Sequence, residues 1–392
     1  MSSTHLNSAK TLLSALALAA APGLFAPAAQ AQTSSILLTA TGQVSGIVVS
    51  PPTMYTIATT PLIWNGLMQS IAPYLMPYSE TLRQLALNKA PRLKPMASAP
   101  TPPAQVYGNG YSQLVSFGDS MSDTGNMYEV TLKLGGTGLP TAPNDRGRFS
   151  NGPVVLEAMA NALNRPLLNY AFGGARSGST NLIPAYGMQH GMLKQIGDFL
   201  ANQPSIWTPV DANALYVLWT GPDDFYSDGN IFNPLTVSVV TANIRQGMVQ
   251  LYQRGARQFF VPLMPDLSIT PSAHEHNKTL PTYLASAHAR SAELAAAVTS
   301  MLQAFAKQYP LARVRTFDMY TYSQTRMAQA AAEGYNVTEP CYTPAFMGLP
   351  GPVCAHPDQY LFWDTNHPTA AGSLVIGTAF AEAAAGDALP SR

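Results

Sequence analysis

The sequence contains few charged residues and no excess of either sign. Only 11% of its 392 residues are charged, and 21 basic groups balance 21 acidic ones. A chain without an excess of Lys and Arg lacks the positive field that attracts nucleic-acid phosphates, so we predict no nucleic-acid partner. Hydrophobic residues make up 46% of the chain, which excludes a highly charged disordered protein. The length allows one large domain with an extension, or two domains.

The N-terminus lacks an apolar run long enough to cross a membrane. Its run Leu12–Leu18 follows Lys10 and precedes small and helix-breaking residues that end in Ala29-Gln30-Ala31. A membrane-spanning helix needs about 20 apolar residues, whereas a secretory signal peptide has this shorter pattern. We therefore interpret residues 1–31 as a signal peptide. The mature protein is expected to be secreted or periplasmic, and soluble or peripheral to a membrane.

Cysteine is nearly absent, since only Cys341 and Cys354 occur. In an exported protein, two cysteines separated by twelve residues suggest one disulfide that closes a local loop. Zinc ligands show a two-residue spacing and further Cys or His partners, which these two lack. We therefore predict a disulfide and no metal at this pair.

Several motifs that bind cofactors or define other enzyme classes are missing. The sequence has no P-loop lysine motif, no dinucleotide fingerprint and no G-x-S-x-G elbow. The segment His274-Glu275-His276 has no further ligand cluster near it in sequence, so we interpret it as a surface loop. We predict neither a cofactor nor a metal, and an α/β-hydrolase of the usual kind is disfavoured.

The composition divides the chain into regions. Residues 32–90 carry few charges and are interpreted as an N-terminal accessory region or small domain. Residues 91–110 are rich in Pro and Ala and are interpreted as a stiff, extended linker. Residues 111–392 alternate strands with helices, which favours a parallel sheet covered by helices on both faces. In such folds the chemistry gathers at the carboxyl ends of the strands.

The predicted elements of this last region follow from apolar runs and helix-ending glycines. The strands are expected at Gln113–Phe117, Ala214–Trp219, Gln258–Leu263 and Val314–Phe317. The helices are expected at Val239–Arg254, Leu284–Gln308, Ser323–Glu333 and about Thr369–Ala385.

A serine and an Asp/His pair are the strongest candidates for chemistry. Ser120 lies directly after the first predicted strand, where backbone N–H groups and a helix dipole favour negative charge. A serine there can also be a simple helix cap. A hydroxyl nucleophile needs a base, and a histidine base needs an acceptor on its other nitrogen. Asp364 and His367 lie three residues apart, so one turn can bring carboxylate and imidazole together.

These segments resemble the GDSL or SGNH family of serine esterases and lipases. The stretch Phe117–Asn126 is similar to the family's first block, Asp364–Thr369 fits its last block, and Arg148–Pro153 is similar to a segment found in many members. The form of the first block is most similar to the branch of lipases, phospholipases and glycerophospholipid–cholesterol acyltransferases. The resemblance runs from about Gln113 to the C-terminus and does not reach residues 32–105. It implies a flavodoxin-like three-layer α/β/α sandwich with a parallel sheet, preceded by a small N-terminal extension.

The resemblance also assigns roles to residues. Ser120 would attack the ester carbonyl, His367 would take and return its proton, and Asp364 would orient the imidazole. The oxyanion would be held by the backbone N–H groups of Ser120 and Gly174. The third donor is normally an asparagine, but Asp223 stands at that position in this sequence.

The aspartate at position 223 leaves three alternatives, because an ionised carboxylate accepts hydrogen bonds and repels an oxyanion. Burial keeps Asp223 protonated, or the oxyanion hole works with two donors at a lower rate, or the variant suppresses activity.

The sequence therefore predicts an exported hydrolase of lipid or other acyl esters that works through an acyl-serine. Acyl transfer shares that intermediate and stays open, as do peripheral membrane contact and the oligomeric state. The alternative is a lipid- or membrane-binding protein on the same scaffold that has lost efficient catalysis. Besides Asp223, it is motivated by apolar residues of the N-terminal region, namely Trp64, Tyr74, Leu75, Met76 and Tyr78.

Overall fold

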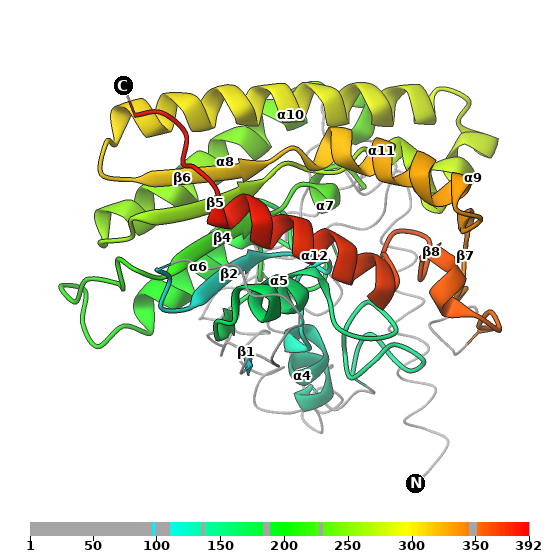
Figure 1. The fold of residues 1–392 in the computed structure, drawn as a ribbon, viewed down its shortest axis with the longest axis horizontal. Coiled ribbons are helices and arrows are strands. Elements are labelled where there is room, and N and C mark those ends of the chain that lie inside the picture. Colours follow the sequence, from blue (N-terminus) through cyan, green and yellow to red (C-terminus); the bar gives the residue numbers. More distant parts are fainter. Residues whose placement is uncertain are drawn as a thin grey trace, which may run out of the picture. The chain divides into compact units, whose positions relative to one another are not determined.

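A mainly parallel β-sheet organises the described part of the chain in a computed structural model (Figure 1). The structure describes residues 96–98, 110–134, 138–182, 189–226, 230–344 and 351–391. The strand order is β1-β3-β2-β4-β5-β6, with β1 antiparallel to β3 and the other neighbours parallel. The strands are β1 (Met96–Ser98), β2 (Leu114–Gly118), β3 (Leu167–Asn169), β4 (Leu215–Trp219), β5 (Gln258–Pro262) and β6 (Arg313–Phe317).

Helices cover both faces of this sheet. One face carries α5 (Val155–Leu163) and α12 (Ala370–Ala385), and the other carries α6 (Met192–Ala201), α8 (Leu235–Gln253) and α10 (Tyr283–Gln308). Successive strand residues point to opposite faces, so the side chains of β2 and β4 divide between the two hydrophobic cores. The three-layer α/β/α architecture implied by the sequence is confirmed.

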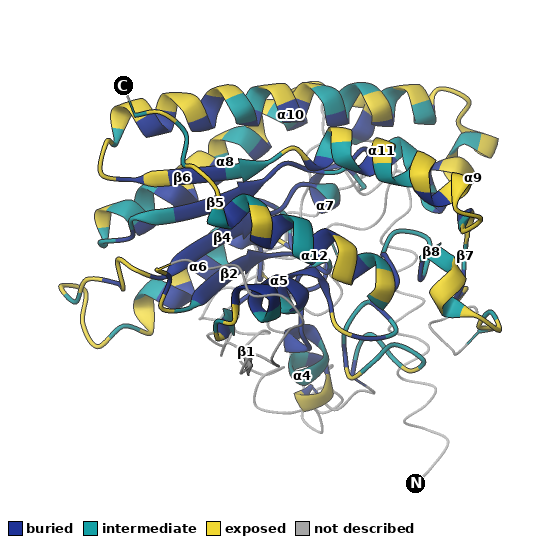
Figure 2. Cartoon of the chain, viewed as in Figure 1, coloured by how far each residue is buried: buried dark blue, intermediate teal, exposed yellow. Residues whose placement is uncertain are grey.

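The central strands β2 and β4 are almost entirely apolar because both of their faces are covered, and Ser116 of β2 is the exception. Every residue of β2 and β4 is buried, as the dark blue strands in Figure 2 show. Phe380 of α12 packs on one face against Trp219, Phe260 and Phe317, with ring centroids 5.0, 5.5 and 5.2 Å away. This packing holds α12 against the sheet.

The remaining elements lie mostly between strands and the helices that follow them. They are α4 (Asn126–Lys133), α7 (Pro222–Phe225), α9 (Pro271–Thr279), α11 (Met319–Ala332), the 3-10 helices η2 (Asn230–Phe232), η3 (Leu267–Ile269) and η5 (Pro357–Gln359), and a two-stranded sheet of β7 (Asn336–Pro340) and β8 (Tyr360–Phe362). Cys341 and Cys354 form a disulfide next to this small sheet.

Two segments that were interpreted from the sequence as a loop and a linker contain regular secondary structure. His274 and His276 lie in helix α9, so the prediction of a surface loop is wrong, although both residues are exposed. Thr270 caps this helix by accepting from the N–H of Ala273, and Pro271 occupies its first turn, a start signal that was missed. Residues 96–98, inside the segment interpreted as a linker, form β1 at the sheet edge.

The signal peptide predicted at residues 1–31 and the accessory region predicted at residues 32–90 lie outside the described residues. Within the described ranges, no helix combines the length and the apolar character that crossing a membrane requires.

Candidate active site

The three predicted catalytic residues lie together at the carboxyl end of the sheet. Ser120 follows β2, and Asp364 and His367 lie in the loop between β8 and α12. Ser120 Oγ is 2.7 Å from His367 Nε2, and His367 Nδ1 is 2.8 and 2.7 Å from the two carboxylate oxygens of Asp364. This hydrogen-bonded chain has the arrangement that activates a serine hydroxyl.

Local hydrogen bonds shape the loop that carries the acid and the base. The Asp364 carboxylate accepts from the backbone N–H groups of Asn366 and His367 at 2.9 and 2.8 Å. The N–H of Trp363 donates to the carbonyl of His367 at 2.8 Å and closes the turn. The Trp363 side chain is buried, and its indole N–H donates to Asn144 at 2.9 Å. The short Asp-x-x-His spacing therefore positions both side chains from a single turn.

The electrostatics of the pair suit a general base. Burial opposes the charged form of Asp364. The nearby His367 charge, the hydrogen bond to the His367 side chain and the backbone N–H groups of Asn366 and His367 outweigh burial and lower the pKa of Asp364. Burial likewise disfavours a charged His367, but the Asp364 carboxylate and its hydrogen bond raise the pKa of His367. The imidazolium that forms when Ser120 gives up its proton is therefore stabilised.

Two backbone N–H groups, those of Ser120 and Gly174, are the predicted donors to the oxyanion. Among the hydrogen bonds of the described residues, none is donated by the backbone N–H of Ser120 or of Gly174. Gly174 has φ +73°, and a Cβ placed there would lie 2.6 Å from Asn181 Oδ1. Both the backbone conformation and the space at this position therefore favour glycine.

Asp123 braces this part of the site, a role that was not predicted from the sequence. Its carboxylate accepts from the N–H groups of Gly125, Asn126 and Met127, and it also accepts from Gly173 at 2.8 Å. It thereby ties the start of α4 to the glycine turn that contains Gly174. Its position inside the motif Phe117–Asn126 was the signal that could have revealed it.

Asp223 lies buried at the start of α7, among other carboxyls. Its Oδ2 has no hydrogen-bond partner among the described residues. Burial raises the pKa of Asp223 well above its usual range, the charges of Asp119 and Asp224 raise it further, and Arg176 opposes them. Burial also raises the pKa of Asp119 to about 7 and that of Asp224 to about 6. These directions favour the first of the three alternatives, a protonated Asp223.

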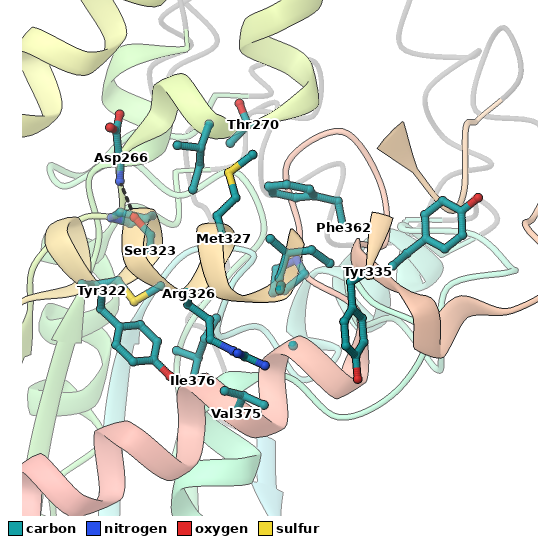
Figure 3. A pocket seen from close by; sticks show the side chains of 18 of the residues that line it. Asp266, Thr270, Tyr322, Ser323, Arg326, Met327, Tyr335, Phe362, Val375 and Ile376 are labelled. Carbon is teal, nitrogen blue, oxygen red and sulfur yellow. Dashed lines mark hydrogen bonds between the residues drawn. The ribbon is translucent and has the colours of Figure 1, made fainter. Parts of the chain in front are cut away.

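An apolar pocket lies beside the loop that carries His367. It has a volume of about 130 Å³ and is walled by α11, α12, β8 and the segment that follows β5 (Figure 3). Met121, which follows the serine, and Asn366 and Pro368, which flank the histidine, also line it. No motif in the sequence indicates this pocket, because its walls come from segments far apart in the chain.

The fold is a three-layer α/β/α sandwich that carries a hydrogen-bonded Ser, His and Asp at the end of its sheet, and comparison with known proteins identifies the family. The profile of the GDSL-like Lipase/Acylhydrolase family matches residues 114–380. The chain belongs to the GDSL-like lipase/acylhydrolase family.

Three relatives illustrate the range of this family. The chain is 27% identical over 281 residues to a thermolabile hemolysin of Vibrio parahaemolyticus, covering 66% of this chain and 60% of the relative. It is 34% identical over 167 residues to a phosphatidylcholine-sterol acyltransferase of Aeromonas hydrophila, covering 42% and 47%. It is 25% identical over 324 residues to a GDSL esterase/lipase of Arabidopsis thaliana, covering 70% and 89%. The chain therefore spans less than two thirds of the length of the first two relatives.

Proposed function

We propose that the protein is an exported serine hydrolase of carboxylic esters, acting on lipid or other acyl esters through an acyl-serine intermediate. The observation that carries this proposal is the chain of hydrogen bonds from Ser120 through His367 to Asp364, each 2.7 or 2.8 Å long. Family membership and the names of the relatives support a lipid ester as substrate. The N-terminal signal pattern and the disulfide support export.

Each step of the reaction can be assigned to a residue. Ser120 Oγ attacks the ester carbonyl while its proton passes to His367 Nε2. The developing oxyanion is held by the N–H groups of Ser120 and Gly174 and by the protonated carboxyl of Asp223. His367 then gives the proton to the leaving alcohol, and the acyl group stays on Ser120.

The second half of the reaction regenerates the enzyme. A water molecule gives its proton to His367 and attacks the acyl-serine, which releases a carboxylic acid and restores the Ser120 hydroxyl. Another alcohol in place of water would yield a new ester, so hydrolysis and acyl transfer use the same residues. The acyltransferase of Aeromonas hydrophila among the relatives motivates a test of both.

The alternative function, lipid binding without efficient catalysis, was motivated by a charged Asp223 in the oxyanion hole. A raised pKa at Asp223 weakens this motive, because a neutral carboxyl donates a hydrogen bond instead of repelling the oxyanion. The apolar N-terminal residues that also motivated it lie outside the described residues.

Hydrolysis of p-nitrophenyl esters from acetate to palmitate tests the proposal. Ser120→Ala is expected to lower kcat by about 10⁵-fold or more, because the nucleophile is lost. Ser122→Ala is the matched control, since that buried hydroxyl has no hydrogen-bond partner among the described residues, and its rate should stay close to wild type. Equal rates for Ser120→Ala and wild type would overturn the proposal.

A further inference from the structure

The pocket beside the catalytic loop has a mostly apolar wall. Its apolar side chains come from segments between residues 121 and 376, and they include Met121, Ile269, Met319, Met327, Phe362 and Val375. Figure 3 shows side chains of α11, α12 and β8 converging around it. Its volume of about 130 Å³ is enough for a short stretch of hydrocarbon, being roughly that of four liquid water molecules.

Several polar groups of the wall are already bonded within the protein, whereas Asn366 Oδ1 is buried and has no hydrogen-bond partner among the described residues. Asp266 accepts from Ser268, His288 and Gln324, and its own N–H donates to Ser323 Oγ. Arg326 at the wall is paired with Glu333 at 3.1 Å. At Asp266 and Arg326 a polar ligand would have to compete with existing hydrogen bonds, whereas an apolar ligand needs only the apolar surface that makes up most of the wall.

The pocket adjoins the reacting groups through the backbone that carries them. Met121 follows the nucleophile directly, and Asn366 and Pro368 lie on either side of His367. Ser120 and His367 do not themselves line the pocket, so an acyl chain on Ser120 would have to pass Met121, the next residue, to reach it. Methionine is unbranched and flexible, which suits a side chain that has to move aside for a chain of methylene groups.

We propose that this pocket receives the distal part of the substrate's acyl chain, which passes Met121 on its way from Ser120. The proposal rests on the proposed ester hydrolase function and adds to it a site that sets chain-length preference. Each methylene group that enters the pocket should raise kcat/KM by about fourfold, and the rise should stop once the pocket is full.

Two neighbouring residues of α12 provide a matched test. Val375 lines the pocket and is 38% exposed, whereas Leu374 does not line it and is 59% exposed. Val375→Phe adds a ring to the pocket wall, and Leu374→Phe adds the same ring outside it. For the decanoate and dodecanoate esters of p-nitrophenol, kcat/KM of Val375→Phe should fall about tenfold or more. For the butyrate ester, it should stay within about twofold of wild type. Leu374→Phe should follow wild type across the series.

A binding experiment separates the pocket from the reaction. In the Ser120→Ala background, displacement of a fluorescent fatty acid by laurate measures occupation of the pocket without turnover. Binding should be weakened about tenfold or more by Val375→Phe and unchanged by Leu374→Phe. The proposed acyl-chain pocket would be overturned if Val375→Phe and Leu374→Phe both bound laurate as tightly as the Ser120→Ala protein alone and both hydrolysed the ester series with the same chain-length profile. A wild-type protein that hydrolyses no ester would overturn the proposed function, and the laurate measurement would still decide on the pocket.

Discussion

A carboxyl group at position 223 makes the protonation state of one residue decisive for the proposed reaction. Burial and neighbouring carboxylates raise the pKa of Asp223, so the group stays neutral at pH values where an ordinary aspartate is charged. A neutral carboxyl donates to an oxyanion, and it loses this capacity when it ionises. The alkaline limb of the activity profile should therefore report ionisation of Asp223. The acid limb should report His367, whose pKa is raised above its ordinary value.

We predict that Asp223→Asn extends activity to higher pH. An amide donates a hydrogen bond at every pH, so the variant should keep its kcat where the wild type declines. Asp223→Ala removes the donor altogether and should lower kcat by about 10²- to 10³-fold. The measurement is kcat from pH 5 to 10 for the three proteins. Identical profiles for wild type and Asp223→Asn would remove Asp223 from the mechanism.

Gly174 has a left-handed backbone and is proposed as an oxyanion donor, and substitutions can separate these two roles. Gly174→Ala forces an alanine to φ +73° and places its Cβ 2.6 Å from Asn181 Oδ1. Gly334→Ala is the matched control, because it has φ +88° with no atom within 4 Å of the added Cβ and lies in the turn after α11. The left-handed backbone should cost each variant about 1 to 2 kcal/mol in urea denaturation. Only Gly174→Ala should also lose kcat, and equal activity of the two variants would contradict a role in the oxyanion hole.

At the scale of elements, the disulfide supports the loop that carries Asp364 and His367. The N–H of Cys341 donates to the carbonyl of Phe362 at 3.0 Å, and the Tyr342 ring stacks on Trp363 with centroids 5.3 Å apart. The disulfide thus holds the segment that packs against the residue before Asp364. It closes a loop whose ends are 13 residues apart in sequence.

We predict that the double variant Cys341→Ser and Cys354→Ser loses about 3 kcal/mol in free energy of unfolding, the value expected for a loop of this length. Because the segment contacts the catalytic turn, kcat should fall as well under conditions where the variant is still folded. Wild type treated with a reductant should behave like the variant. A variant with wild-type stability and kcat would show that the disulfide does not support the site.

Most strands of the main sheet could be predicted from the sequence. The strands β2, β4, β5 and β6 were predicted to within one residue at each end. The first three are mostly apolar, as buried parallel strands are, whereas β6 at the sheet edge contains Arg313 and Arg315. The three-residue strand β3 was missed, since so short a run carries no periodicity. Helices α5 and α6 were missed as well, although both bury one apolar face.

In the site, residues in short local motifs could be predicted from the sequence, whereas contacts between distant segments could not. Ser120, Asp364 and His367 were predicted to act together because short local motifs reveal them, and the structure places them within hydrogen-bonding distance. The carboxyl cluster around Asp223 and the pocket beside the catalytic loop could not be predicted. Both depend on which strands are neighbours in the sheet, and that order does not follow the order of the sequence.

Buried carboxyls near the site also make the stability of the whole molecule depend on pH. Burial raises the pKa of Asp119 to about 7 and the pKa values of Asp123 and Asp224 to about 6. An unfolded aspartate has a pKa of about 3.9, so between pH 4 and 7 the folded protein retains protons that the unfolded chain has released. The free energy of unfolding therefore decreases as pH rises through this range. His190 acts in the opposite direction below about pH 6.5, because burial lowers its pKa to about 3.

We predict that the free energy of unfolding is higher at pH 5 than at pH 7.5, by on the order of 2 kcal/mol, because several carboxyls oppose a single histidine. The lowered pKa values of Asp364 and Asp266 do not change this sign, since both groups are ionised throughout that range and lose their contribution only at lower pH. Urea denaturation at the two pH values is the measurement. Asp223→Asn should reduce the difference, because it removes one carboxyl whose ionisation the fold opposes. A free energy of unfolding that increases from pH 5 to pH 7.5 would mean that the cluster is ionised in the folded protein, and Asp223 would then be unable to donate to the oxyanion.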